Sequence, residues 1–223
     1  MLQVATLKFL KDLKKNNSKE WFDKNRTLYD NAREDFLGLV QQVIDEFGKK
    51  EISIASLKAK ECVFRINRDV RFSKDKSPYK TNMGASINKG GKKAWNTAGY
   101  YFHFEPGGSF MGGGLYMPEA QVLKKVRQEI DYNFNDFKKI IGNKKFVAIY
   151  KDLDHSGEMK LSRPPKDYMA DNPAIEYIKL KSFITMAPLT DADLTEKGLV
   201  KKITAAFDTL QPLIDFLNHA TQD

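Results

Sequence analysis

CVFRINRDVRFSKDKSPYKTNM, residues 62–83, is the stretch that decides how this chain is expected to fold. Alternate residues differ in polarity along its first half. One set is apolar apart from Arg68, and the other is almost wholly polar (Cys62, Phe64, Ile66, Val70, Phe72; Val63, Arg65, Asn67, Asp69, Arg71). An extended strand sends successive side chains to opposite faces. The alternation therefore predicts a strand over 61–72, ended by the Ser, Lys and Asp residues before Pro78.

The same stretch concentrates positive charge. Six cations and two anions lie between residues 65 and 80, a net of +4 out of the chain's formal +8 (Arg65, Arg68, Arg71, Lys74, Lys76, Lys80; Asp69, Asp75). Arg offers a planar fork of donors for carboxylate or phosphate, and Lys acts as a mobile point charge. One interpretation is a solvated strand and loop in which Asp69 pairs with the neighbouring guanidinium groups. The other is an anion-binding site, because three crowded Arg residues repel one another without a ligand or partner.

Three segments carry a resemblance to a known family. They are RINRDVRFSKDKSPYK at 65–80, NNSKEWF at 16–22 and GYYFHFEPGGSFMGGGLYMP at 99–118. Together they resemble an uncharacterised family of conserved bacterial proteins, the domain of unknown function 2461 family, over most of the chain. The resemblance implies a single-domain soluble protein and implies no activity.

Composition narrows the class of protein. With 41% hydrophobic residues, the 223-residue chain can build an ordinary core. A net charge of +8 and a pI near 9.3 favour acidic partners. Cys62 is the only cysteine, which excludes a disulfide framework and a multi-cysteine metal site, and its place among apolar residues predicts a buried thiol. The sequence shows neither a signal peptide nor a transmembrane run, so we expect a cytoplasmic protein with no membrane partner.

The remaining pattern predicts an α+β fold: one domain over 1–223, with an antiparallel central sheet flanked by N-terminal and C-terminal helices. Helices are expected from Thr6 to Asn16, from a capping box at Asn17 and Glu20 to Gly48, over 119–140, over 172–180, and from Thr190 or Thr195 to Asn218 with Pro212 kinking or dividing the last one. Strands are expected over 52–57, 61–72, 83–87, 99–106, 109–116 and 182–187. Residues 143–151 fit either a helix or a strand, and Gly112-Gly113-Gly114 predicts a bulge or a close backbone approach to a ligand.

The strand expected over 99–106 supplies a second polar row. Tyr100, Phe102 and Phe104 would form its apolar face, and Tyr101, His103 and Glu105 the other. If this row shares a sheet face with the cations of 65–80, the two form a site for an anionic substrate with acid–base help. Mg²⁺ or Mn²⁺ could be ligated by Asp69, His103 and Glu105, but nothing in their spacing requires a metal. Neither His155, in a Gly/Ser loop, nor His219 has comparable neighbours in the sequence.

The sequence therefore supports two functional hypotheses and a structural one. The favoured hypothesis is a protein that binds or processes a phosphorylated or carboxylated small molecule. The alternatives are a nucleic-acid-binding module, whose Tyr101 and basic residues would stack bases and neutralise phosphates, and a protein whose Arg–Asp network is structural. No cofactor is indicated, and the sequence does not separate an enzyme from a binding protein. The predicted catalytic residues are Asp69, His103 and Glu105; the predicted ligand-binding residues are Arg65, Asn67, Arg68, Arg71, Lys74, Lys76, Tyr79, Lys80 and Tyr101.

Overall fold

The computed structural model describes residues 1–221, which cluster into two compact units. Unit 1 contains residues 1–92, 101–111 and 188–205, and unit 2 contains residues 93–100, 112–187 and the chain from 206 onward. Strands β2, β3 and β4 and helix α10 contribute residues to both units. The single domain expected over 1–223 stays a prediction.

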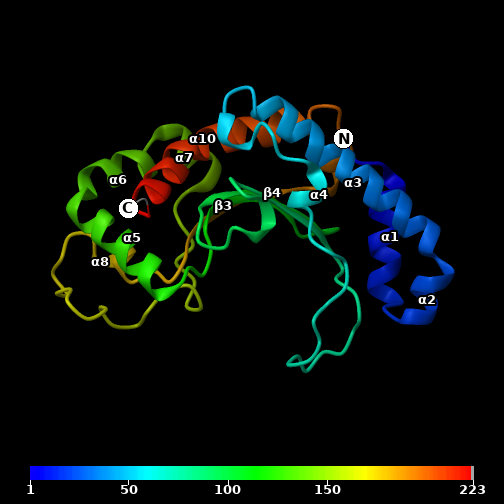
Figure 1. Ribbon diagram of the computed structural model, residues 1–223, viewed down its shortest axis with the longest axis horizontal. Helices are drawn as coiled ribbons and strands as arrows, with labels where there is room; N and C mark the ends of the chain where they lie inside the picture. The colour runs from blue at the N-terminus through cyan, green and yellow to red at the C-terminus, as the bar shows by residue number, and fades with distance from the viewer. Residues whose placement is uncertain (222–223) are drawn as a thin grey trace. The chain divides into compact units, whose positions relative to one another are not determined.

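The fold is α+β, as predicted, with helices flanking a four-stranded antiparallel sheet in the order β1-β2-β3-β4 (Figure 1). The strands are β1 (Met83–Ile87), β2 (Gly99–Phe104), β3 (Ser109–Leu115) and β4 (Phe183–Leu189). All four match predicted strands. The alternation of β2 is also confirmed, because Tyr100, Phe102 and Phe104 are buried, whereas Tyr101 and His103 keep partial exposure.

Helices of unit 1 cover its part of the sheet's apolar side. Helix α3 (Arg26–Phe47) packs against α1 (Val4–Lys15), α2 (Lys19–Lys24), α4 (Ala59–Cys62) and β1. The Phe36 ring of α3 stacks on the rings of Phe102 and Phe104, with centroids 5.8 and 6.2 Å away. Cys62 is fully buried, as predicted. The short helix α9 (Asp191–Thr195) also belongs to this unit and is capped by Thr190. The last helix, expected to start at Thr190 or Thr195, instead begins at Leu199.

Two predicted helices are interrupted. The helix expected over 17–48 is divided at Asn25 into α2 and α3, and its capping residue is Ser18, whose Oγ accepts a hydrogen bond from the Trp21 amide. The helix expected over 119–140 is divided at Asn133 into α5 (Ala120–Tyr132) and α6 (Phe134–Ile141). Asn at both breaks fits its low preference for helix interiors.

Unit 2 consists mainly of helices that pack against one another. Helix α5 packs against α6 and α8 (Ile175–Ile178), and α6 packs against α7 (Lys144–Tyr150), so the ambiguous stretch 143–151 is a helix. Helix α10 (Leu199–His219), which begins in unit 1, contains Pro212 without ending there. A Cβ on Gly112 would lie 2.1 Å from the Thr185 carbonyl oxygen of β4, and one on Gly113 would lie 2.3 Å from the Gly99 carbonyl oxygen of β2, so the close approach at these glycines is to the neighbouring strands.

Two predicted strands are wrong. Residues 52–57 contain a 3₁₀ turn, η1 (Ile52–Ile54), and residues 61–72 begin within α4 and then run as irregular chain. A second short 3₁₀ turn, η2 (Gly91–Lys93), follows β1. Only two isolated bridges replace the strand expected over 61–72, Val63 with Ala85 and Asn67 with Tyr79. Phe72, expected on the buried face, is 95% exposed. The alternating pattern failed because no continuous partner strand pairs with this segment.

Residues 65–80 instead form a two-legged excursion, which we call the arm. Its legs meet through hydrogen bonds from the Arg68 amide to the Pro78 carbonyl (2.9 Å) and from the Lys80 amide to the Ile66 carbonyl (2.8 Å). In Figure 1 the arm is the teal loop that extends away from the helices and the sheet of its unit. Among residues 1–221, no helix is both long and apolar enough to span a bilayer.

Candidate anion-binding site

The polar row of β2, formed by Tyr101, His103 and Glu105, is connected by hydrogen bonds. His103 Nε2 lies 3.4 Å from Glu105 Oε2, and His103 Nδ1 lies 3.2 Å from both the Tyr101 hydroxyl and the Asn82 amide nitrogen. The amide nitrogen is a donor, so Nδ1 accepts and the proton of the neutral ring sits on Nε2, where it is donated to Glu105. Phe110 stacks on the imidazole at 4.6 Å and fixes the plane of the ring.

The sheet leaves room for the Tyr101 hydroxyl at Gly84 of β1. A Cβ at this position would lie 2.5 Å from the hydroxyl oxygen and 3.2 Å from the ring carbon that bears it. Real Cβ atoms do not approach other atoms this closely, so glycine is needed for Tyr101 to reach His103 in this geometry. The position of Tyr101 therefore depends on a residue of the neighbouring strand.

The surroundings of His103 and Glu105 favour a neutral imidazole and an ionised carboxylate. Burial lowers the pKa of His103, and the hydrogen bond and charge of Glu105 offset part of that effect. Burial would raise the pKa of Glu105, but hydrogen bonds from His103, Thr81 and Lys14 outweigh it and leave the pKa below its ordinary value. The result is a neutral imidazole whose Nε2 is held by the Glu105 carboxylate and whose Nδ1 lies within hydrogen-bond distance of the Asn82 amide and the Tyr101 hydroxyl. This arrangement is suited to accepting and returning a proton.

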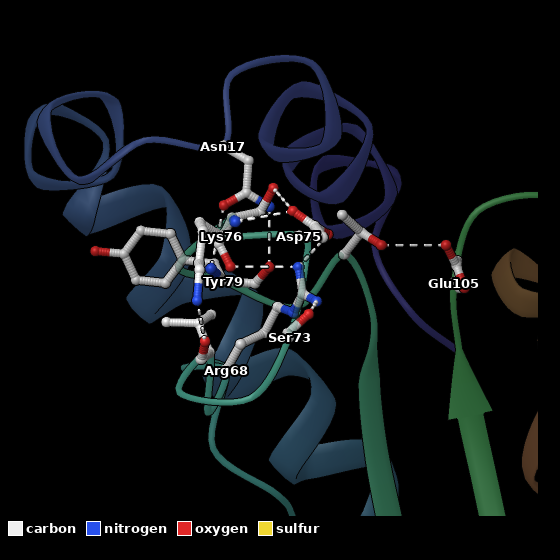
Figure 2. A network of polar contacts seen from close by, with 10 residues as sticks. Asn17, Arg68, Ser73, Asp75, Lys76, Tyr79 and Glu105 are labelled. Atoms are coloured by element: carbon white, nitrogen blue, oxygen red, sulfur yellow. Dashed lines mark hydrogen bonds and ion pairs between the residues drawn. The ribbon is translucent and has the colours of Figure 1, made fainter.

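The arm contains its own network of polar contacts around Arg68 (Figure 2). The guanidinium pairs with Asp75 and also donates to the Ser77 carbonyl and the Ser73 hydroxyl, both at 3.3 Å. Asp75 accepts hydrogen bonds from the Ser77 amide (2.9 Å) and hydroxyl (2.7 Å), and these contacts, followed by that of Arg68, lower its pKa to about 2. Arg68 therefore holds the turn of the arm together.

A second set of contacts fastens the arm to α2. Asn17 donates from Nδ2 to the Tyr79 carbonyl (2.9 Å) and accepts from the Tyr79 amide (3.1 Å), so it pairs with both backbone groups of one residue. The Tyr79 ring stacks on Phe22 at 3.9 Å and is buried. Tyr79, predicted to bind ligand, thus anchors the arm through its ring and through its backbone, whose hydrogen bonds with Asn17 are drawn in Figure 2.

The outer part of the arm is exposed to solvent. Asp69 and Arg71 form a two-pronged ion pair, with distances of 2.9 and 2.7 Å, and their side chains are 45% and 76% exposed. The hydrogen bonds from Arg71 lower the pKa of Asp69. Lys76 donates to the Val70 carbonyl at 3.0 Å, while Asn67 and Lys74 are exposed. Exposed ion pairs contribute little free energy, so these cations can exchange partners easily.

Arg65 and Lys80 lie where the two legs of the arm meet the fold, and we call this pair the arm root. The Lys80 ammonium is half-buried and lies 5.5 Å from the centre of the Phe64 ring. Among residues 1–221 it forms no hydrogen bond or ion pair with another side chain. Burial lowers its pKa, and the positive charge of Arg65 lowers it further. A half-buried ammonium that has a cationic neighbour and no ion pair among residues 1–221 would gain from an anionic partner.

Contacts in unit 1 connect the arm root to the polar row. Phe64, which lies under Lys80, also contacts the Tyr101 ring, with centroids 6.5 Å apart. Thr81, the residue after Lys80, donates to Glu105 Oε1 at 3.2 Å, the link drawn at the edge of Figure 2. Phe64 and Thr81 thus link the arm root to the polar row. Asp69 and Arg71 are instead paired with each other on the outer arm.

Sequence analysis missed several partners of the polar row. Asn82 and Phe110 contact His103, and Lys14 lies 3.4 Å from Glu105. The polar pair Thr81-Asn82 directly before β1 was the available signal. Lys14 gave none, since it comes from a helix 91 residues away along the chain. No group of three or more His, Cys, Asp or Glu side chains in the described part of the chain could hold a metal ion.

His155 lies near more polar and aromatic side chains than its place in the sequence indicated. In unit 2 its Nε2 lies 3.4 Å from Asp152, its Nδ1 lies 3.5 Å from the Lys160 ammonium, and the Tyr177 ring meets it edge-on at 5.3 Å. Tyr177 also donates to Asp152, and burial together with the Asp152 charge raises its pKa to about 12. Lys160 also pairs with Glu176, and Lys179 lies 3.8 Å from the same carboxylate, so the two lysines equal Glu176 and Asp152 in number.

Comparison with known proteins gives one result at the level of the family. The family model described as "Conserved hypothetical protein (DUF2461)" matches residues 5–216, which is nearly the whole chain. No curated protein and no solved structure is significantly similar to the chain.

Proposed function

The chain belongs to the DUF2461 family of conserved hypothetical proteins, and we propose from the contacts of its basic segment that it binds a phosphorylated or carboxylated small molecule at the arm root. The observation that carries the proposal is the Lys80 ammonium. It is half-buried, lies against an aromatic ring, has Arg65 as its charged neighbour, and lacks an anion among the described residues. A bound anion would supply the missing charge and end the repulsion between the two cations.

The neighbouring polar row gives this site a chemical role. His103 is neutral, oriented by Glu105, and connected to the arm root through Phe64 and Tyr101. A ligand held by Arg65 and Lys80 would present its uncharged part toward this row. The Tyr101 hydroxyl, 3.2 Å from His103 Nδ1, would then take a proton from the ligand as it gives its own to the imidazole, with Glu105 stabilising the imidazolium. The predicted catalytic role of Asp69 is not part of this proposal, because Asp69 is committed to Arg71.

The contacts of Arg68 and Tyr79 support a structural role for part of the predicted site. Both residues hold the arm in place through partners within the fold. The structural interpretation of the Arg–Asp network therefore applies to Arg68 and Asp75. It does not extend to Lys80, which has no such partner.

A thermal-shift and calorimetric screen of the full chain tests the proposal. The ligands are inorganic phosphate, pyrophosphate, a sugar phosphate, a nucleoside monophosphate and a dicarboxylate. At least one should raise the melting temperature of the wild type. Lys80→Met should weaken its binding about 10- to 150-fold, the equivalent of a charge-assisted hydrogen bond of about 1.5–3 kcal/mol.

The matched control is Lys201→Met, which removes one charge from an exposed position of α10 in the same unit. Its affinity should equal that of the wild type. The proposal fails if no ligand shifts the melting temperature, or if Lys80→Met and Lys201→Met bind equally well.

A further inference from the structure

The end of the arm carries a feature that the anion site does not use. Phe72 is 95% exposed, the highest value among the exposed large hydrophobic side chains of the described chain. The Arg71 guanidinium lies 5.7 Å from the centre of its ring. Single exposed apolar residues are common on proteins. This one, however, stands on an excursion that extends away from its unit (Figure 1), next to a cation.

Cations outnumber anions around Phe72. We call residues 71–76 the arm tip; it contains Arg71, Lys74 and Lys76, all exposed, against Asp75, which is committed to Arg68 and Ser77, and Asp69 pairs with Arg71 from just outside it. The charge of the chain is also unevenly divided. Unit 1 has 23 Lys and Arg against 16 Asp and Glu, a net of +7, and unit 2 has 14 against 13, a net of +1. An anionic partner is therefore drawn to the unit that bears the arm.

The arm tip is held in shape before any partner arrives. Arg68 ties the two legs together through Asp75, Ser77 and Ser73, and Asn17 fixes the inner end at Tyr79. Lys76 closes the turn by donating to the Val70 carbonyl. A preorganised element loses less conformational entropy on binding than a flexible loop does. The fold thus maintains an exposed aromatic ring among cations in a defined position.

We propose that the arm tip binds single-stranded nucleic acid. A base stacks on the open face of Phe72. Lys74 neutralises a neighbouring phosphate, and Arg71 and Lys76 exchange their exposed partners, Asp69 and the Val70 carbonyl, for phosphates on either side of that base. Single strands offer a π-face and a negative charge at every nucleotide, the two features that this tip can recognise. An acidic protein surface would pair with the cations but offers no base to stack on Phe72. In a duplex, the faces of the bases are covered by the neighbouring base pairs. Since these cations contact phosphates, binding should show little sequence preference.

Fluorescence polarisation with the full chain tests this proposal. The probes are labelled 12-nucleotide dT and U strands and a labelled 12-base-pair duplex, titrated between 50 and 300 mM NaCl. The wild type should bind both single strands more tightly than the duplex. Phe72→Ala should weaken single-strand binding about 5- to 150-fold, the range measured for loss of one base–aromatic stack, and Phe72→Tyr should restore it.

A variant without two of the arm-tip charges, with a matched control, measures the electrostatic part of binding separately from base stacking. Lys74→Gln/Lys76→Gln should reduce the slope of log affinity against log salt by roughly 1.4, about 0.7 for each lost phosphate contact. Lys197→Gln/Lys201→Gln, which removes equal charge from exposed positions of the same unit, should leave the slope nearly unchanged. Because Phe72 is exposed, Phe72→Ala should keep the melting temperature of the wild type.

Four results would overturn the proposal: no binding at 50 mM NaCl, equal affinity of Phe72→Ala and wild type, tighter binding of the duplex, or complete competition by polyglutamate at equal charge concentration. The small-molecule site is independent of this outcome. Phe72→Ala should retain anion binding at Lys80, and Lys80→Met should retain binding of the single strands.

Discussion

Replacing Asn17 by Ala should loosen the attachment of the arm just before α2, while the stack of Tyr79 on Phe22 remains. The substitution removes both hydrogen bonds to the Tyr79 backbone, at 2.9 and 3.1 Å, and leaves a partly buried amide and carbonyl without partners. Each lost hydrogen bond is worth about 1 kcal/mol, and an unsatisfied buried group costs about 1–3 kcal/mol. We expect a loss of about 2–4 kcal/mol in unfolding free energy. For a chain of this length that corresponds to about 5–15 °C in melting temperature.

Urea unfolding with a parallel hydrogen-exchange measurement checks this prediction. The Tyr79 amide should exchange faster in Asn17→Ala, because its acceptor is gone. Asn16→Ala is the matched control: its side chain donates only to the Asp12 carbonyl on the exposed end of α1, and its loss should cost less than about 1 kcal/mol. Equal stability of the two variants, or unchanged exchange at Tyr79, would refute the inference that Asn17 anchors the arm.

Two further predictions concern the polar row. Gly84→Ala should push the Tyr101 hydroxyl away from His103 and cost about 1–3 kcal/mol of unfolding free energy, the range for overpacking; an unchanged histidine NMR spectrum would show that Tyr101 did not move. Because the pKa of His103 is lowered in the fold, the unfolded chain binds the proton more readily, and stability should fall as the pH drops below about 6.5. The pKa of Glu105 is also lowered, so a further loss should follow below about 4.5. In urea unfolding, His103→Asn should remove the first of these two steps and reduce the second, because the hydrogen bond from His103 contributes to the lowered pKa of Glu105.

The strands that were predicted correctly share a physical reason. In β2, Tyr100, Phe102 and Phe104 are buried and the intervening residues are not, so the sequence records the two environments of a half-buried strand. Residues 62–66 follow a similar alternation, and Cys62 and Ile66 are indeed buried. The pattern says nothing, however, about whether a continuous partner strand exists.

In the site, too, the sequence predicted which side chains share a strand face but not which distant residues they contact. The alternation of β2 was sufficient to place His103 and Glu105 on one face, and the structure confirms that they contact each other. The distinction between Arg68 and Lys80 was not available from the sequence. Both are cations of one basic segment, and only the folded arm pairs the first with Asp75 and places the second against Phe64.

The pKa of the Lys80 ammonium, measured by NMR on the full chain with and without a bound anion, tests the central claim most directly. In the free protein the account predicts a pKa below the ordinary lysine value, because of burial and the charge of Arg65. On saturation with the anion that stabilises the protein most in the screen, the pKa should rise, since an opposite charge favours the protonated form. An ordinary pKa in the free protein, or a lowered one that the anion leaves unchanged, would contradict the assignment of Lys80 as the anion-binding residue.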